Sequence, residues 1–203
     1  MWYNIHKYRI REGKMVFLYY CEDEKDYSTD EKVAAIARYH LLRENGITPE
    51  SELLKIERQS KGKPYFPNMP DLHFSVSHSG SVFVCALSDS PVGVDIQEYK
   101  KRPDEEERCR KIAARFFHFD EVDALDADTV SAFYNIWTAK EAYVKFTGDG
   151  IDGDFSAFCI FDLDEYLYQT ELCGMSLSVC MPDVDDVEIE NIDLKRLSEG
   201  DGK

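Results

Sequence analysis

The stretch HFSVSHSGSVFVCALSDSPVGVDIQ (residues 73–97) predicts three short strands in close succession. The strands are HFSVSHS, VFVCALS and PVGVDIQ, and turn residues separate them. An amphipathic helix pattern, EKVAAIARYHLLRENG (residues 31–46), precedes them and ends at a glycine. Strands that follow one another so closely after a helix favour a mainly antiparallel sheet packed against that helix.

The same order of elements is repeated in the second half of the chain. A predicted helix over residues 131–147 is followed by three strand-like runs, FSAFCIFDL, YLYQTEL and MSLSVCM. We therefore predict an α+β fold with two halves, residues 1–97 and 98–203, each a mainly antiparallel sheet packed against helices. The segments MWYNIHKYRI (residues 1–10) and KMVFLYY (residues 14–20) predict an additional hairpin.

Composition limits the kinds of function that the chain can perform. Of the 203 residues, 43% are hydrophobic and 13% aromatic, which indicates a well-packed core. Forty acidic residues against 24 basic ones give a formal charge of −16, which argues against nucleic-acid binding. An anionic substrate would therefore have to bind in a local basic pocket or at a metal ion.

The spacing of the cysteines and the lengths of the apolar runs bear on where in the cell the protein is located. None of the six cysteines forms a C-x-x-C pair or has the spacing of a zinc site, so we interpret them as reduced thiols that serve as small apolar side chains. The N-terminus lacks the apolar run of a signal peptide, and no run of about 18 apolar residues is present. We expect a cytoplasmic protein with no membrane segment.

The predicted helix NIWTAKEAYVKFTGDG (residues 135–150) carries Trp137, Glu141 and Lys145 along one side. One interpretation is a surface ion pair between Glu141 and Lys145, worth about 0.3–0.5 kcal/mol. The other is a functional site, because a tryptophan exposed beside such a pair would be unusual. Spacing alone leaves both open.

Two further segments carry polar residues in positions that suit ligand binding. In PVGVDIQ, Asp95 and Gln97 share one face of the strand, which is either solvated or a set of oxygen ligands for a hard cation such as Mg²⁺. In GKPYFPNMPDLHFSVSHSG, Lys63, Ser77 and His78 either bind phosphate or mark a strand that ends in a turn.

Taken together and in this order, these blocks resemble the 4′-phosphopantetheinyl transferases. The blocks are GKPYF, FSVSHSG, GVDIQ, RFFHFDE and WTAKEAYVKFTGDGI, and they run from about Lys61 to Ile151. The similarity is to the longer, single-chain type that activates synthetase carrier proteins. It implies a monomer with a pseudo-twofold α+β fold and an active site at the interface between the halves 1–97 and 98–203. It also implies Mg²⁺-dependent transfer of phosphopantetheine from coenzyme A to a serine of an acyl, peptidyl or aryl carrier protein.

The resemblance also implies roles for individual residues. Asp95 and Glu141 match magnesium ligands of the family, and Glu121 matches an acidic position near the metal. Gln97 stands where many members have a third acidic ligand, so the metal would be bound more weakly or with an additional water. Lys145 matches the lysine beside the pyrophosphate.

The remaining positions concern coenzyme A and proton transfer. Lys63, Ser77 and His78 match the positions that bind the coenzyme A phosphates, and the 3′-phosphate would go to a basic residue of the first half, with Lys32 and Arg38 as candidates. Glu141, directly or through a metal-bound water, is the candidate base that accepts the serine proton.

Three points remain open at this stage. The same acids would also suit a Mg²⁺-dependent phosphohydrolase. The replacement at Gln97 would suit a non-catalytic module that binds coenzyme A or a carrier protein. Because carrier proteins are usually acidic, docking would require a local basic strip or an apolar patch, and EYKKR (residues 98–102) and FFHF (residues 116–119) are the candidates.

Overall fold

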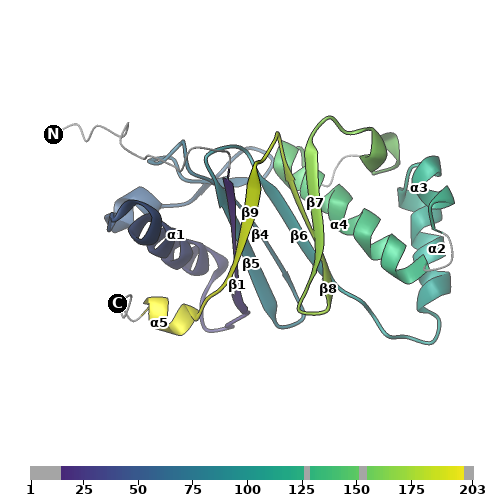
Figure 1. The fold of residues 1–203 in the computed structure, drawn as a ribbon, viewed down its shortest axis with the longest axis horizontal. Helices are drawn as coiled ribbons and strands as arrows, with labels where there is room; N and C mark the ends of the chain where they lie inside the picture. The colour runs from purple at the N-terminus through teal and green to yellow at the C-terminus, as the bar shows by residue number, and fades with distance from the viewer. Residues whose placement is uncertain (1–14, 126–128, 151–154, 199–203) are drawn as a thin grey trace.

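A computed structural model describes residues 15–125, 129–150 and 155–198 of the chain. It shows four layers, in which two sheets lie between two long helices (Figure 1). Helix α1 (Thr29–Asn45) covers the outer face of the first sheet, and helix α4 (Thr129–Thr147) covers the outer face of the second. All pairings but one are antiparallel, so the predicted mainly antiparallel α+β fold is confirmed.

The first sheet has the strand order β4-β5-β1-β9. Its strands are β1 (Met15–Glu22), β4 (His73–Ser79), β5 (Val82–Ser88) and β9 (Asp186–Asn191). Strand β1 confirms the prediction for KMVFLYY, and it pairs in parallel with β9. Its predicted hairpin partner, residues 1–10, lies outside the described residues.

The second sheet has the strand order β6-β8-β7 and is backed by helices. Its strands are β6 (Gly93–Glu98), β7 (Tyr166–Leu172) and β8 (Met175–Met181). Helix α4 packs on β6 and β8, and α2 (Glu105–Phe116) packs on the other side of α4, followed by the short α3 (Phe119–Asp123). None of the described helices is long and apolar enough to span a bilayer.

Short elements connect the layers. They are η1 (Ser51–Leu54), β2 (Glu57–Arg58), β3 (Pro64–Tyr65), η2 (Phe155–Ala157), η3 (Ile160–Asp162) and α5 (Leu194–Ser198). The strand predicted for FSAFCIFDL is therefore wrong, because 3₁₀ turns occupy this run. Its backbone bonds to side chains instead of a neighbouring strand: the carbonyls of Phe155 and Phe158 accept from Lys140, and the Ile160 N–H donates to Glu121.

Three apolar clusters hold the layers together. One lies between α1 and the first sheet and includes Phe17 and Tyr19 of β1. The second lies between the two sheets and includes Val16 and Leu18, the alternate residues of the same strand. The third joins α2 and α4. Because β1 contributes to two clusters through its two faces, the first sheet is buried on both sides.

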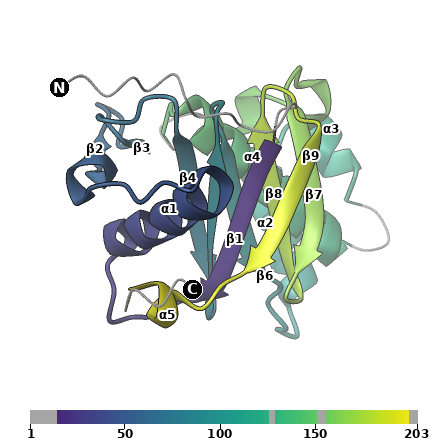
Figure 2. The same ribbon diagram turned by 60° about the vertical axis from the view of Figure 1, so that its left-hand side comes forward.

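Each sheet contains one strand from the opposite half of the chain. Strand β6 follows β5 along the chain but pairs with β8 of the second sheet, and β9 follows β8 but pairs with β1 of the first. Figure 2 shows the N-terminal β1 and the C-terminal β9 side by side. The boundary between the two sheets therefore does not coincide with residue 97 of the chain. The division into halves 1–97 and 98–203 stays a prediction.

Serine side chains bridge the two sheets where the edge strands β4 and β6 lie side by side. The hydroxyls of Ser75, Ser77 and Ser79 accept hydrogen bonds from the N–H groups of Val94, Ile96 and Glu98, at 3.0, 3.4 and 2.9 Å. In an antiparallel strand alternate N–H groups point away from the partner, so these N–H groups of β6 are not directed at β8. The serines satisfy them without extending the backbone ladder.

Removing one hydroxyl of this bridge is expected to destabilise the protein. Ser75→Ala leaves the buried Val94 N–H without its acceptor, so we expect the free energy of unfolding to fall by about 1–3 kcal/mol in urea titrations. Ser81→Ala, in the exposed β4–β5 turn, is the control and should change stability by less than about 0.5 kcal/mol. Equal effects of the two substitutions would contradict the bridging role.

Candidate active site

A glycine in β6 allows helix α4 to approach the strand directly. A Cβ atom on Gly93 would lie 2.0 Å from the carbonyl oxygen of Ala142 and 2.4 Å from the nitrogen of Phe146. Both contacts are with backbone, which cannot rotate aside, so this crossing requires glycine. The close crossing places the turn of α4 that carries Glu141 and Lys145 over the strand that carries Asp95.

Asp95 is the buried centre of the site, with 2% of its surface exposed. Its Oδ1 accepts from the hydroxyl of Ser77 and from the Lys145 ammonium, both at 2.7 Å. Its Oδ2 accepts from the side-chain amide of Gln97 at 3.1 Å. The structure therefore brings together four of the residues selected from the sequence.

Lys145 is directed at Asp95, so the stripe on α4 is not a surface ion pair between Glu141 and Lys145. In addition to its ion pair with Asp95, the ammonium donates to the backbone carbonyls of Val94 at 3.0 Å and Val76 at 3.4 Å. About 30% of the side chain remains exposed. The ammonium thus lies between the buried acid and solvent.

Glu141 lies half-buried beside this pair. Burial raises the pKa of its carboxyl above the ordinary value, the negative charge of Asp95 raises it further, and Lys145 lowers it. A carboxylate whose pKa is raised in this way binds a proton more readily than a free glutamate. Glu141 therefore has the electrostatic environment that a general base requires.

A cavity of about 220 Å³ opens next to Glu141 and Lys145. Lys61 and Lys63 also line it, so three lysines border the space although the chain is acidic overall. The Lys61 ammonium is paired with Asp149 at 2.8 Å. Burial lowers the pKa of Lys63, whose ammonium donates to the carbonyl of Phe146 at 2.5 Å. The cavity is therefore suited to a phosphorylated ligand.

The two β4 residues matched to coenzyme A phosphates point in opposite directions. Ser77 is buried and donates to Asp95, so its hydroxyl is engaged inside the site. His78 is exposed on the other face of the strand and is not among the described residues that line the cavity. Of the three predicted phosphate ligands, Lys63 alone lines this cavity.

Glu121 lies elsewhere, in a fully buried ion pair with Lys140. One carboxylate oxygen lies 2.8 Å from the Lys140 ammonium and accepts from the N–H of His118, and the other accepts from the N–H of Ile160. These contacts occupy both oxygens. The expectation that Glu121 is a metal ligand beside Asp95 is therefore not supported, since the carboxylate would have to break this buried pair.

Sequence reasoning missed Lys140, although a signal was present. Lys140 lies four residues after Ile136 and four before Val144, in the middle of an apolar row of the helix. A lysine in such a row must find a buried anion or carbonyl groups. Here it finds Glu121 and the carbonyls of Phe155 and Phe158.

Other residues selected from the sequence belong to the core or to the surface. Trp137 packs against Phe133 and Phe155 in the cluster between α2 and α4. Lys32 forms a buried ion pair with Asp23, so it is not available to a phosphate. In FFHF, Phe117 is buried whereas Phe119 is 68% exposed.

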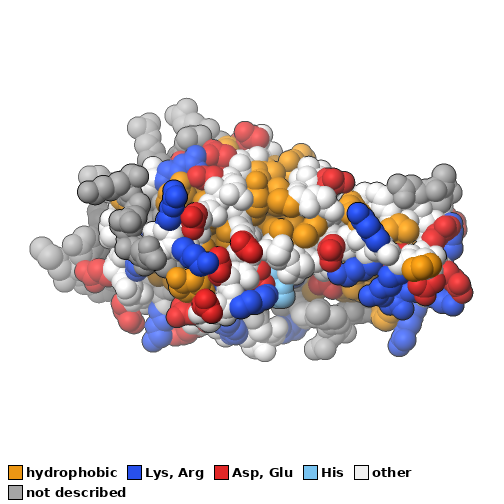
Figure 3. Space-filling view, turned by 90° about the horizontal axis from the view of Figure 1, so that it is seen from below, with side chains coloured by type: hydrophobic (Ala, Val, Ile, Leu, Met, Phe, Trp, Pro, Cys, Tyr) orange, Lys and Arg blue, Asp and Glu red, His pale blue; other side chains and the backbone are white. Residues whose placement is uncertain are grey.

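Charge on the surface is distributed unevenly. On the face drawn in Figure 3, acidic and basic side chains alternate, and Lys and Arg are densest at the end of the molecule that carries α2. Exposed basic residues of α2 and of the segment before it include Lys101, Arg102, Arg108, Lys111 and Arg115. The same helix exposes Glu106 and Glu107, which pair with Arg110 and Lys111, so the positive charge at this end is partly neutralised.

The donor set around Asp95 is chemically suited to Mg²⁺. Asp95 and Glu141 are two carboxylates close enough for one to raise the pKa of the other, and a divalent cation would relieve that repulsion. Gln97 adds an amide oxygen on the same strand face, although its amide nitrogen is the atom now directed at Asp95. Asp95, Glu141 and Gln97 are thus the residues that would hold the ion.

Comparison with known proteins gives consistent matches. Residues 91–192 match the family model described as the 4′-phosphopantetheinyl transferase superfamily. The chain is 37% identical over 106 residues to a 4′-phosphopantetheinyl transferase of Bacillus subtilis and 38% identical over 123 residues to psf-1 of Bacillus pumilus. These alignments cover 50% and 59% of this chain but 45% and 50% of the relatives, so the chain spans about half their length.

A shorter relative is matched over a larger share of its length. The 4′-phosphopantetheinyl transferase AcpT of Salmonella typhi is 33% identical over 153 residues, which cover 70% of this chain and 73% of AcpT. The family match includes Asp95, Gln97, Glu141 and Lys145, the polar residues of β6 and α4 that meet in the site. The chain therefore belongs to the 4′-phosphopantetheinyl transferase superfamily.

Proposed function

We propose that the protein transfers 4′-phosphopantetheine from coenzyme A to a serine of an apo carrier protein, in a Mg²⁺-dependent reaction. The observation that carries the proposal is the placement of Glu141 and Lys145 beside Asp95, at the edge of a cavity lined by lysines. Membership of the superfamily supports the reaction class. The carrier would be an acyl, peptidyl or aryl carrier protein, and the enzyme would act as a monomer in the cytoplasm.

The reaction exchanges one phosphorus–oxygen bond for another. The serine oxygen attacks the β-phosphorus of coenzyme A, the bond to 3′,5′-ADP breaks, and the serine hydroxyl loses its proton. Glu141 is the proposed acceptor of that proton, because its half-buried carboxylate has a raised pKa. The leaving group departs as a phosphate anion, which requires positive charge close to it.

Lys145 is proposed to supply that charge. Its ammonium is held by Asp95 and by two backbone carbonyls, and its partly exposed side chain lines the cavity. It can therefore turn from Asp95 toward the leaving phosphate without a change in the backbone. Lys63 and Lys61, which line the same cavity, would hold the remaining phosphates of coenzyme A, and Lys61 would exchange its ion pair with Asp149 for a phosphate.

Asp95 and its neighbours provide the rigid base of the site. Ser77 fixes Oδ1 and Gln97 contacts Oδ2, so the carboxylate has a defined orientation on β6. When bound by Asp95, Glu141 and Gln97, Mg²⁺ would supply charge neutralisation for the pyrophosphate. The burial of Asp95 keeps water from competing for this position.

One experiment distinguishes the proposal from its alternatives. The protein is incubated with coenzyme A, Mg²⁺ and an apo carrier protein, and the carrier is weighed by mass spectrometry. We expect the carrier to gain the mass of one phosphopantetheine. Release of phosphate or phosphopantetheine to water without carrier modification would indicate a phosphohydrolase, and binding of coenzyme A without turnover would indicate a non-catalytic module.

In the same assay, Glu141→Gln is expected to lower the rate of transfer by at least about 100-fold, because the proposed base is removed while the side-chain shape is kept. The matched control is Glu171→Gln, an exposed glutamate of β7, which should transfer at the wild-type rate. Wild-type turnover by the Glu141 variant would exclude Glu141 as the base.

The same substitution should also stabilise the protein. The folded state binds the Glu141 proton more tightly than the unfolded chain does, so stability is lost as pH rises through the raised pKa. We expect Glu141→Gln to raise the free energy of unfolding at pH 7 by about 0.5–2 kcal/mol. The gain should vanish below the ordinary glutamate pKa of 4.5, where both side chains are neutral. Urea titrations from acid to neutral pH test this, and a gain that is constant over this range would contradict it.

Gln97→Glu tests whether residue 97 contributes to metal binding. The added carboxylate beside Asp95 should lower the Mg²⁺ concentration needed for half-maximal transfer by about tenfold. Asn191→Asp, which adds the same charge at the end of β9, is the control and should leave the Mg²⁺ requirement unchanged. An identical requirement in both variants would mean that residue 97 is not near the metal.

A further inference from the structure

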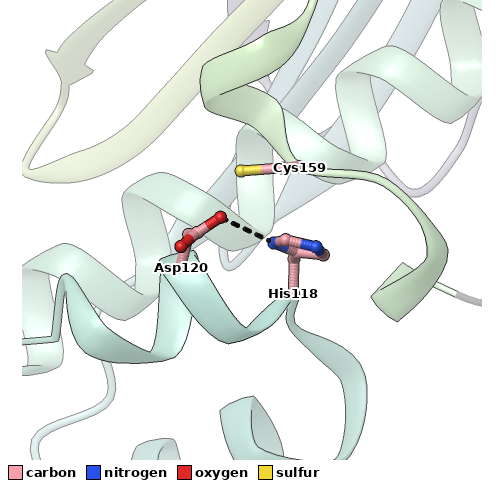
Figure 4. A group of neighbouring side chains, drawn as sticks. All are labelled: His118, Asp120 and Cys159. Atoms are coloured by element: carbon pink, nitrogen blue, oxygen red, sulfur yellow. Dashed lines mark ion pairs between the residues drawn. The ribbon is translucent and has the colours of Figure 1, made fainter.

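Three potential metal ligands lie together outside the site described above. They are His118, Asp120 and Cys159, and their ligand atoms all lie within 4.8 Å of one another. His118 precedes α3 as its N-cap residue and Asp120 lies in its first turn, whereas Cys159 lies between η2 and η3. Figure 4 shows the three side chains in the space between these two segments, with the ion pair between His118 and Asp120 marked.

The imidazole of His118 has an atom whose bonding capacity is not used. Its Nδ1 is buried, and it forms no hydrogen bond to any described residue. Oδ2 of Asp120 lies 3.3 Å away but makes no hydrogen bond with it. A buried ring nitrogen without a protein partner is completed by a water or by an ion.

We propose that His118, Asp120 and Cys159 bind one divalent cation of the zinc type. Zinc bond lengths of about 2.0–2.3 Å place two ligands of a tetrahedral ion about 3.4 Å apart, close to the separation already found between His118 and Asp120. The Cys159 sulfur lies within 4.8 Å of both of these atoms and would move toward them on binding. An imidazole and a thiolate select zinc over Mg²⁺, which prefers oxygen ligands.

The charges of the ligand set suit a divalent ion. One thiolate and one carboxylate carry two negative charges, which balance a divalent ion with a neutral imidazole. Cys159 is buried, and burial raises the pKa of its thiol, so the thiol is protonated without the ion and binding would have to displace that proton to solvent. Three protein ligands leave a fourth position for water on the side where Asp120 is exposed.

The bound ion would join the two segments that also enclose the buried Glu121–Lys140 pair. The N–H of His118 and the N–H of Ile160 both donate to Glu121. His118 is itself a proposed ligand, and Ile160 directly follows the proposed ligand Cys159. Lys140 directly precedes Glu141 in α4. The proposed role of the ion is therefore to connect these two segments behind the helix that carries the proposed base, and it would take no part in the proposed transfer.

The test measures zinc binding directly, in a full-length Cys173→Ser background that lacks the exposed thiol. Titration calorimetry is carried out with zinc alone as the ligand, in excess Mg²⁺. We expect one zinc per chain, and a loss of affinity greater than about 100-fold in both Cys159→Ala and His118→Asn. Asparagine is chosen at position 118 because it keeps a good N-cap for α3. Cobalt should give a thiolate charge-transfer absorption that Cys159→Ala abolishes.

Two controls keep the result interpretable. Asp120→Asn alters a half-exposed side chain, so it should fold normally and still weaken zinc binding by about tenfold or more. Asp95→Asn changes the proposed magnesium site and should leave zinc binding unchanged. The proposal is overturned if the Cys173→Ser protein binds no zinc, if the three ligand variants bind it as the parent does, or if Asp95→Asn abolishes binding.

Discussion

Two open sheet edges meet at β4 and β6, and three serine hydroxyls hold them together. An unpaired edge exposes N–H groups that cannot be buried without acceptors. The hydroxyls of Ser75, Ser77 and Ser79 accept from N–H groups of β6, so side chains of β4 take the place of the backbone carbonyls that would accept in a ladder. Ser77 has a second role, because it also donates to Asp95. The same hydrogen bonds that join the sheets thus orient the central acid of the site.

Helix α4 supplies a lysine to each of two buried carboxylates, and the two pairs differ in freedom. Lys140 and Glu121 are fully buried and bonded on every side, so removing either partner would leave an uncompensated charge. Lys145 reaches Asp95 from the cavity and remains partly exposed. The first pair has the character of a structural support, and the second is the one that would exchange its partner for a phosphate in the proposed reaction.

Much of this architecture follows from local sequence patterns, and the rest depends on contacts between distant segments. Short runs of strand-forming residues between turn signals predicted β4, β5, β6, β7 and β8, and apolar residues at helical spacing predicted α1 and α4. Strand β9 was missed because its short sequence DVEIEN has only two apolar residues, Val187 and Ile189, among acidic ones. For the site, the family resemblance selected Asp95, Glu141 and Lys145, and the structure places Glu141 and Lys145 beside Asp95. The ion pair of Glu121 was not anticipated, because its partner Lys140 lies 19 positions away, a pairing that no local pattern encodes.

The parallel pairing of β1 with β9 has a consequence for how the chain folds. Met15 is opposite Asp186, so the two strands of this pair are 171 positions apart in the sequence. A ribosome that has made β1 must therefore continue through β9 before the first sheet can acquire this strand. The entropy of closing so long a loop must be met before the contacts form, which places this pairing among the slow, late events of folding. Until then β1 has a free edge, and a nascent chain is exposed to incorrect pairing there.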